Sequence, residues 1–250
     1  MIPKVIHYCW FGRNPLPELA LKCIDSWKRF FPEYTIIQWN EDNFDVNINQ
    51  YTTEAYKAGK FAFVSDFARF FVLYTHGGIY FDTDVEVIRG MDDLLKNGSY
   101  MGCEHPNNGN NLPVEFGVAP GLGMACEAGN TFIKKMIDYY NTISFYKEDG
   151  SFNQTTIVQH TTYMLIEDGL KNINEVQKCA GFIIYPIEYF CPIDYQTGKI
   201  TITDNTYTIH HYMASWISKG QKMYVVFKKI FGEKLARLIS QILKKYKIVK

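Results

Sequence analysis

The sequence predicts an α/β fold, because strand-like and helix-like segments alternate from its first residues. Residues 5–10 (VIHYCW) form a short apolar run that ends near glycine and proline, which is typical of a buried strand. Residues 16–27 repeat apolar side chains at helical spacing, and residues 35–39 (TIIQW) predict a second strand. A strand, a helix and a strand within 40 residues predict a parallel unit at the N-terminus.

A second helix and a third strand follow in the middle of the chain. Residues 61–75 place aromatic side chains at helical spacing. On this helix Asp66 and Arg69 are three residues apart, so we expect their side chains to lie close together. Two glycines at 77–78 predict the end of the helix, and residues 79–81 (IYF) then predict a short buried strand.

The rest of the chain predicts shorter elements around one long loop. Residues 104–123 are rich in Asn, Gly and Pro and predict an irregular loop of the kind that often binds ligands. The other predicted elements are helices at 130–141 and 155–166, strands at 182–185, 199–203 and 207–210, and two basic helices at 223–231 and 233–246.

Composition and charge exclude several classes of protein. The 250 residues are 47% hydrophobic and 21% charged, which excludes disordered and collagen-like chains. Basic and acidic residues number 26 each, and this balance argues against a dedicated nucleic-acid binder. The charge is uneven, however: residues 219–250 hold ten Lys or Arg and one acid, so they carry +9 and residues 1–218 carry −9. This asymmetry indicates either a surface for anionic partners or a basic helix pair packed on an acidic body.

The cysteines and the hydropathy pattern predict the cellular compartment in which the protein is found. Six cysteines are scattered singly without a C-x-x-C pair, which argues against structural zinc and indicates buried free thiols. The chain shows no signal-peptide pattern and no apolar run of about 20 residues. We therefore expect a cytoplasmic protein.

The motif Asp82-Thr83-Asp84 follows the predicted strand at residues 79–81. Ligands of α/β sheets bind at the carboxyl ends of strands, and alternate carboxylates can reach one divalent cation that bridges to a diphosphate. Such a motif also occurs in solvated turns and in phosphatases of the haloacid-dehalogenase type. Those phosphatases place Thr or Val two residues after the second Asp, where this chain has Glu86.

The residues around this motif resemble glycosyltransferase family 32. The matching segments are residues 2–12 (IPKVIHYCWFG), 63–69 (FVSDFAR), 77–84 (GGIYFDTD) and 210–216 (HHYMASW). That family includes bacterial capsular polysaccharide transferases and fungal mannosyltransferases, and the clostridial glucosylating toxins look similar at these motifs. The resemblance implies a GT-A type nucleotide-diphospho-sugar transferase fold, an α/β fold with a mixed central sheet and C-terminal helices. It would occupy residues 1–218, and residues 219–250 would form a basic amphipathic helical extension.

The resemblance also implies roles for individual residues. The implied catalytic residues are Asp66, Arg69, Asp82 and Asp84. The nucleotide and the donor sugar would be bound by Trp10, Asp66, Arg69, Tyr80, Asp82, Ser215 and Trp216, with the nucleotide base stacked on the indole. The metal would be bound by Asp82, Asp84 and His211, with His210 as the alternative imidazole.

The expected function is metal-dependent, retaining transfer of a hexose or N-acetylhexosamine to a glycan of the capsule or lipopolysaccharide type. Mn²⁺ or Mg²⁺ would be the cofactor, and a UDP-sugar is favoured over GDP-mannose as donor. Glu104, Glu115 and residues 107–111 and 153–155 are candidates for the acceptor site by their position only. A non-catalytic nucleotide- or sugar-binding module is an alternative, although it would not need both Asp82 and Asp84.

The basic extension, residues 219–250, indicates a membrane as a binding partner. Its second predicted helix has Leu235, Leu238, Ile239 and Ile242 on one face and lysines and an arginine around it. Such a helix can lie on an anionic membrane surface, where a lipid-linked acceptor would be found. We therefore expect a peripheral position on the inner face of the cell membrane and no nucleic-acid partner.

Overall fold

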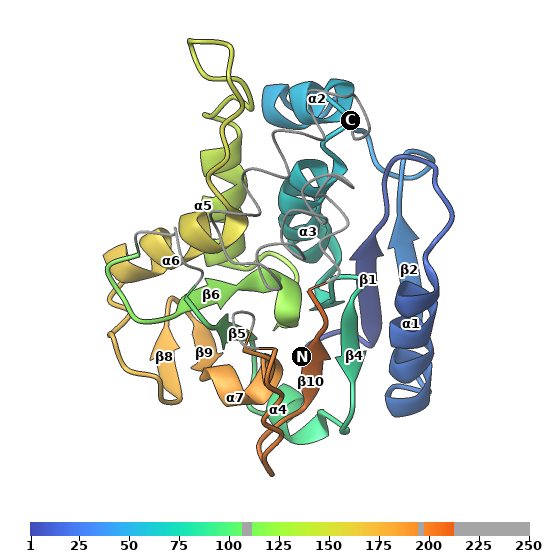
Figure 1. The fold of residues 1–250 in the computed structure, drawn as a ribbon, viewed down its shortest axis with the longest axis vertical. Coiled ribbons are helices and arrows are strands. Elements are labelled where there is room, and N and C mark those ends of the chain that lie inside the picture. Colours follow the sequence, from blue (N-terminus) through green and yellow to red (C-terminus); the bar gives the residue numbers. More distant parts are fainter. Residues whose placement is uncertain (107–111, 195–197, 213–250) are drawn as a thin grey trace, which may run out of the picture. The chain divides into compact units, whose positions relative to one another are not determined.

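The N-terminal parallel unit is present as predicted. A computed structural model describes residues 1–106, 112–194 and 198–212. In it β1 (Val5–Cys9) pairs in parallel with β2 (Thr35–Trp39), and α1 (Glu18–Phe30) connects the two strands (Figure 1). Trp27 of α1 is fully buried and its indole N–H donates to the carbonyl of Val85, which fixes the helix against the following part of the domain.

The central sheet is mixed. Within the described residues it has eight strands in the order β2-β1-β3-β7-β5-β9-β8, with β6 paired to β5. The further strands are β3 (Gly78–Tyr80), β5 (Tyr100–Glu104), β6 (Gly117–Ala119), β7 (Met124–Cys126), β8 (Gln177–Cys179) and β9 (Phe182–Tyr185). The predicted fold class, α/β with a mixed central sheet, is confirmed.

The pairing pattern gives the sheet one edge with a special role. β1 is parallel to β2 and to β3, β3 and β5 are each antiparallel to β7, and β5 is parallel to β9. Strands β1, β2, β3, β5 and β9 therefore run in the same direction, and their carboxyl ends meet at one edge. Trp10, Asp82 and Glu104 lie at or just beyond three of these ends. Ligands of open α/β sheets bind at this kind of edge.

A short antiparallel ribbon completes that edge. It consists of β4 (Val85–Val87) and β10 (Thr208–His210), with His210 opposite Val85 (Figure 1). The ribbon is separate from the central sheet. It carries a C-terminal segment back to the residues that follow β3, which are more than 120 positions earlier in the chain.

The central helix α3 (Phe61–His76) agrees with its predicted bounds. It ends at Gly77, whose φ of 64° is unfavourable for other residues and whose N–H donates to the carbonyl of Leu73. The other helices are α2 (Gln50–Lys57), α4 (Asp92–Lys96), α5 (Thr131–Tyr140), α6 (Ile157–Glu167), α7 (Ile187–Phe190) and the 3₁₀ turn η1 (Pro120–Leu122). None of the helices within the described ranges combines the length and the apolar character needed to cross a membrane.

The prediction about the cysteines is confirmed, because all six are buried free thiols. His7 of β1 is also fully buried, and both of its ring nitrogens have partners. Its Nε2 donates to the carbonyl of Gly77 (2.9 Å), and its Nδ1 accepts from Nε1 of Trp39 (3.0 Å). Burial lowers the pKa of His7 to about 4, so the ring is neutral.

Two predictions about the segments after β5 begins are wrong. Residues 199–203 do not form a strand: only an isolated bridge joins Ile193 to Ile200, and Ile200 and Ile202 are more than half exposed. Within the described residues, no strand lies beside the alternating pattern of that segment to pair with it. Residues 104–123 are not wholly irregular, because β6 and η1 lie inside them and are buried against β5. The predicted helices at 223–231 and 233–246, and the proposed domain boundary after residue 218, fall outside the described residues.

Candidate functional site

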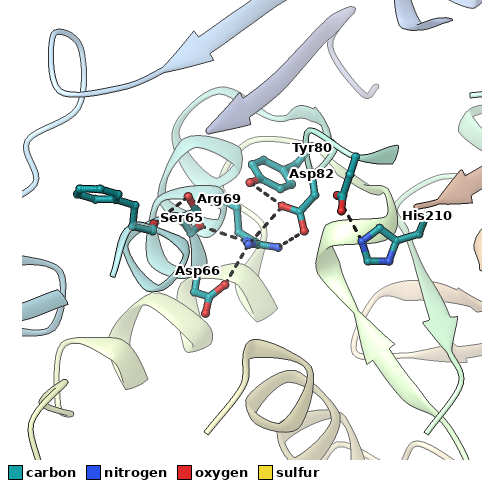
Figure 2. Close-up of polar contacts among 8 residues, drawn as sticks. Ser65, Asp66, Arg69, Tyr80, Asp82 and His210 are labelled. Atoms are coloured by element: carbon teal, nitrogen blue, oxygen red, sulfur yellow. Dashed lines mark hydrogen bonds and ion pairs between the residues drawn. The ribbon is translucent and has the colours of Figure 1, made fainter. Parts of the chain in front are cut away.

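Arg69 lies between two carboxylates at the carboxyl edge of the sheet (Figure 2). Its Nη2 is 3.0 Å from Oδ1 of Asp66, one turn away on α3, which confirms the predicted pair. Its Nη1 is 3.4 Å from Oδ2 of Asp82, and its Nε donates to the carbonyl of Ser65 (3.1 Å). Arg69 is 4% exposed and Asp66 is 7% exposed. The guanidinium is therefore held from three sides in a site with little water.

The buried pair changes the ionisation of both partners. Burial raises the pKa of Asp66 to about 7, since the attraction of Arg69 only partly offsets the loss of water and Asp82 adds repulsion. Burial alone would lower the pKa of Arg69, but the neighbouring Asp82, Tyr80 and Asp66 raise it. Arg69 is thus a permanent cation, whereas Asp66 can accept or release a proton near neutral pH.

Asp82 is oriented by Tyr80 and Gly121. The hydroxyl of Tyr80 donates to Oδ1 of Asp82 (3.1 Å), and the guanidinium of Arg69 lies 4.9 Å from the centre of the Tyr80 ring. The N–H of Asp82 donates to the carbonyl of Gly121 (2.9 Å). A Cβ on Gly121 would lie 2.0 Å from Oδ2 of Asp82, so only glycine leaves room for this carboxylate. The Asp82 side chain is 30% exposed, which leaves it accessible to a ligand.

Each of the two adjacent histidines meets a different acid. Nε2 of His210 is 3.3 Å from Oδ1 of Asp84, whereas Nε2 of His211 is 2.8 Å from Oε2 of Glu86. The N–H of His211 donates to the carbonyl of Asp84 (3.0 Å). The structure therefore brings His210 to the Asp-x-Asp motif. His211, which the resemblance favoured as the metal ligand, has its imidazole on Glu86 instead.

His210 lies among carboxylates. Burial alone would lower its pKa, but attraction to Asp84, to Glu104 and to Asp82 raises the pKa to about 9. Its Nδ1 is enclosed and has no hydrogen-bond partner in the described part of the chain. The carboxyl edge therefore holds an excess of negative charge, which suits a cationic ligand.

The other predicted residues are placed as follows. Trp10 follows β1 at the same edge, is partly buried, and donates from its Nε1 to the carbonyl of Asn14 (2.7 Å). Base stacking on Trp10 stays a prediction. Ser215 and Trp216 lie outside the described residues.

The chemistry of the motif suits a hard divalent cation, although the described protein ligands are few. In the part of the chain that the structure describes, no three His, Cys, Asp or Glu side chains lie close enough together to bind a metal ion by themselves. Carboxylate oxygens are ligands that Mg²⁺ prefers, and Mg²⁺ commonly takes its other ligands from water and substrate phosphates. Asp82 and Asp84 therefore fit a site that a phosphate-bearing ligand completes.

Comparison with known proteins matches the segment that carries most of these residues. Residues 17–100 match the family described as "Glycosyltransferase sugar-binding region containing DXD motif". The match contains Asp66, Arg69, Tyr80, Asp82 and Asp84. The predicted resemblance to glycosyltransferases with this motif is confirmed.

Curated relatives and solved structures share this similarity. The chain is 29% identical over 123 residues to inositol phosphoceramide mannosyltransferase 3 of Schizosaccharomyces pombe, covering 46% of this chain and 33% of that protein. It is 31% identical over 119 residues to mannosyl phosphorylinositol ceramide synthase CSH1 of Saccharomyces cerevisiae, covering 44% and 30%. The chain thus spans about a third of the length of the curated relatives it matches. Galactosyltransferase LgtC, solved with donor and acceptor sugar analogues, is 13% identical with a TM-score of 0.46, covering 95% of both chains. The PaToxG glycosyltransferase is 20% identical with a TM-score of 0.41, covering 55% of this chain and 59% of that chain.

Proposed function

We propose that this protein is a GT-A glycosyltransferase that moves a hexosyl or N-acetylhexosaminyl group from a nucleotide sugar to a glycan acceptor. The observation that carries the proposal is the cluster formed by the buried Asp66–Arg69 pair and the partly exposed Asp82 at the carboxyl edge of a mixed sheet, inside the matched sugar-binding region. A cation held between two carboxylates presents fixed donors and acceptors to a polyhydroxylated ligand. This is the chemistry that a sugar recognises.

The proposed division of labour follows the position of each side chain. Asp66 and Arg69 hold hydroxyl groups of the donor sugar in the drier part of the site. Asp82, which is partly exposed, and Asp84 bind the divalent metal, with Mn²⁺ or Mg²⁺ as the ion. The imidazole nearest to these acids is that of His210, so we place His210 rather than His211 beside the metal. Trp10 stacks on the base of the nucleotide.

Transfer with retention is the proposed stereochemistry. The acceptor oxygen forms a bond to the anomeric carbon while the bond from that carbon to the diphosphate oxygen breaks. The bonding electrons leave with the diphosphate, and the proton of the acceptor hydroxyl passes to the diphosphate oxygen. A bound metal would neutralise the charge of the departing diphosphate.

The donor and its metal requirement are the first things to measure. The proposed donor carries a hexose or an N-acetylhexosamine. The resemblance favours a UDP-sugar, and the mannosyltransferase relatives add GDP-mannose to the candidates. The full chain is incubated with UDP-glucose, UDP-galactose, UDP-N-acetylglucosamine or GDP-mannose and Mn²⁺, and the released nucleoside diphosphate is measured. We expect release from one donor above the others, and loss of that release in EDTA with recovery on adding Mn²⁺.

Two other outcomes would reject the proposal. Consumption of p-nitrophenyl phosphate, with every nucleotide sugar left intact, would identify a phosphatase. Binding of a nucleoside diphosphate that is independent of metal in calorimetry, with no turnover of any donor, would identify a binding module.

We further propose that residues 219–250, which the structure does not describe, attach the protein to an anionic membrane. Support comes from the sequence alone: the segment carries +9 and one predicted helix has an apolar face. The acceptor would then be a lipid-linked glycan on the inner face of the cell membrane. Loss of binding to phosphatidylglycerol vesicles after deletion of residues 233–250 is expected, and unchanged binding would reject the idea.

A further inference from the structure

We propose that Glu104 binds the hydroxyl group of a neutral, polyhydroxylated acceptor. This proposal rests on the proposed glycosyltransferase function and names the substrate class for a part of the same site. Glu104 is the last residue of β5, so it lies at the carboxyl edge that also carries Asp82. Its role was open from the sequence, where four positions were equal candidates for the acceptor site.

Burial without a partner sets Glu104 apart. The residue is 5% exposed, yet its carboxylate makes no hydrogen bond or ion pair with the described parts of the chain. A carboxylate without partners is costly to bury, and buried polar groups in proteins are nearly always satisfied by protein, water or ligand. Burial raises the pKa of Glu104 to about 7. Attraction to His210 lowers this pKa in part, and repulsion from Asp82 raises it.

The same two neighbours place Glu104 beside the reaction site. It lies within electrostatic reach of both His210 and Asp82, which belong to the proposed metal and donor site. β5 and β3 run in the same direction with β7 between them, so Glu104 lies further along the edge, away from α3. The donor sugar contacts assigned to Asp66 and Arg69 are thus on one side of Asp82, and Glu104 is on the other.

The carboxylate of Glu104 favours ligands that carry hydroxyl groups over ligands that carry phosphates. A carboxylate repels the diphosphate of a donor and accepts hydrogen bonds from hydroxyl groups. In its neutral form it can also donate one. A sugar or another polyol meets these requirements, and a phosphate group does not.

The other charged candidate for this role differs in its surroundings. Glu115 is exposed, and its backbone N–H donates to the side chain of Asn172 (2.8 Å). An exposed carboxylate is already solvated and needs no ligand. Burial therefore distinguishes Glu104 from Glu115.

The test compares Glu104→Gln with Glu175→Gln, a matched change at an exposed position in the loop before β8. Binding of probes is measured by saturation-transfer NMR with Mg²⁺ and UDP or GDP present. The probes are methyl α-mannoside, methyl β-galactoside, methyl β-glucoside and myo-inositol.

We expect at least one probe to bind the wild type and the Glu175→Gln variant with similar affinity. The affinity for that probe should fall roughly 10-fold or more in Glu104→Gln, because a hydrogen bond to a charged acceptor is lost. Melting temperature and affinity for the nucleoside diphosphate confirm that the variant is folded, and Glu104→Leu repeats the test with no acceptor atom.

Each alternative result counts against the proposal. It is overturned if no probe binds the wild type, or if Glu104→Gln and Glu104→Leu both retain the wild-type affinity for the probe. An equal loss in Glu175→Gln would also overturn it, because the effect would not belong to Glu104. Failure of the protein to bind or consume any nucleotide sugar would reject the proposed function instead, and binding of the probes with Mg²⁺ alone would still report on Glu104.

Discussion

Asp84→Asn is expected to lower the rate of nucleotide-sugar consumption by about 10²- to 10³-fold or more, the loss typical of removing one charge-stabilising group from an active site. The change removes one negative charge and keeps the shape of the side chain. Asp84 is 8% exposed and pairs with His210, while its carbonyl, which receives the N–H of His211, is unaffected. The fold should therefore survive while the proposed metal site loses a ligand.

The measurement needs a control for general loss of structure. Asp25→Asn removes the same charge from an exposed pair with Lys28 and should leave the rate unchanged. In Asp84→Asn, calorimetry should show that Mn²⁺ no longer strengthens the binding of a nucleoside diphosphate. A folded Asp84→Asn protein with wild-type activity would refute the proposed role of the motif.

The Arg69→Met variant should lose about 3–5 kcal/mol of the free energy of unfolding, the usual cost of removing one partner from a buried ion pair. Arg69 is the cation that faces both Asp66 and Asp82, and Met fills part of its volume without charge. Urea denaturation at pH 8 measures the loss. Donor turnover should disappear as well, because the proposed sugar contacts are lost.

A double variant separates the charge effect from packing. Without Arg69, the pKa of Asp66 should rise further above its value in the unfolded chain, so the penalty should grow as the pH rises and be smaller at pH 5 than at pH 8. Adding Asp66→Asn to Arg69→Met should restore part of the stability at pH 8. A penalty that is independent of pH and unchanged by Asp66→Asn would show that Arg69 acts through packing alone.

Much of the site could be predicted from the sequence, because several of its residues are separated by short, regular spacings. The three-residue separation of Asp66 and Arg69 fixes their contact on any helix, and the two glycines fix where α3 ends. The position of Asp82 at a strand end follows from the apolar run before it. These relations lie within one or two elements, so periodicity is enough to reveal them.

The histidine assignment shows where such reasoning stops. β10 ends at His210, and the structure places the imidazole of His210 on Asp84 and that of His211, the next residue, on Glu86. This arrangement follows from the register of β10 on β4, with His210 opposite Val85, and it depends on a pairing between segments far apart in the chain. That register cannot be predicted from the local sequence of residues 210–216 (HHYMASW).

The short elements were missed for a related reason. β4, β6, β7 and β8 have three residues each, which is too few for an alternating pattern to appear. α2 is mostly polar, and its available signal was Asn49, whose side chain accepts the N–H of Thr52 as an N-cap. Glu104 had a signal too: it closes the run YMGCE, so β5 could have been predicted with an acid at its carboxyl end.

The ribbon of β4 and β10 couples the site to the core of the domain. Although each strand has three residues and the ribbon is separate from the central sheet, Val85, Val87 and Thr208 are fully buried. The carbonyl of Val85 receives the indole N–H of Trp27, and the N–H of Val87 donates to the hydroxyl of Ser26, so α1 holds β4 in place. Separating His210 from Asp84 would therefore require part of this core to open as well. Amide hydrogens of residues 208–210 should exchange with solvent as slowly as those of α1, and the site is held in its geometry before any ligand binds.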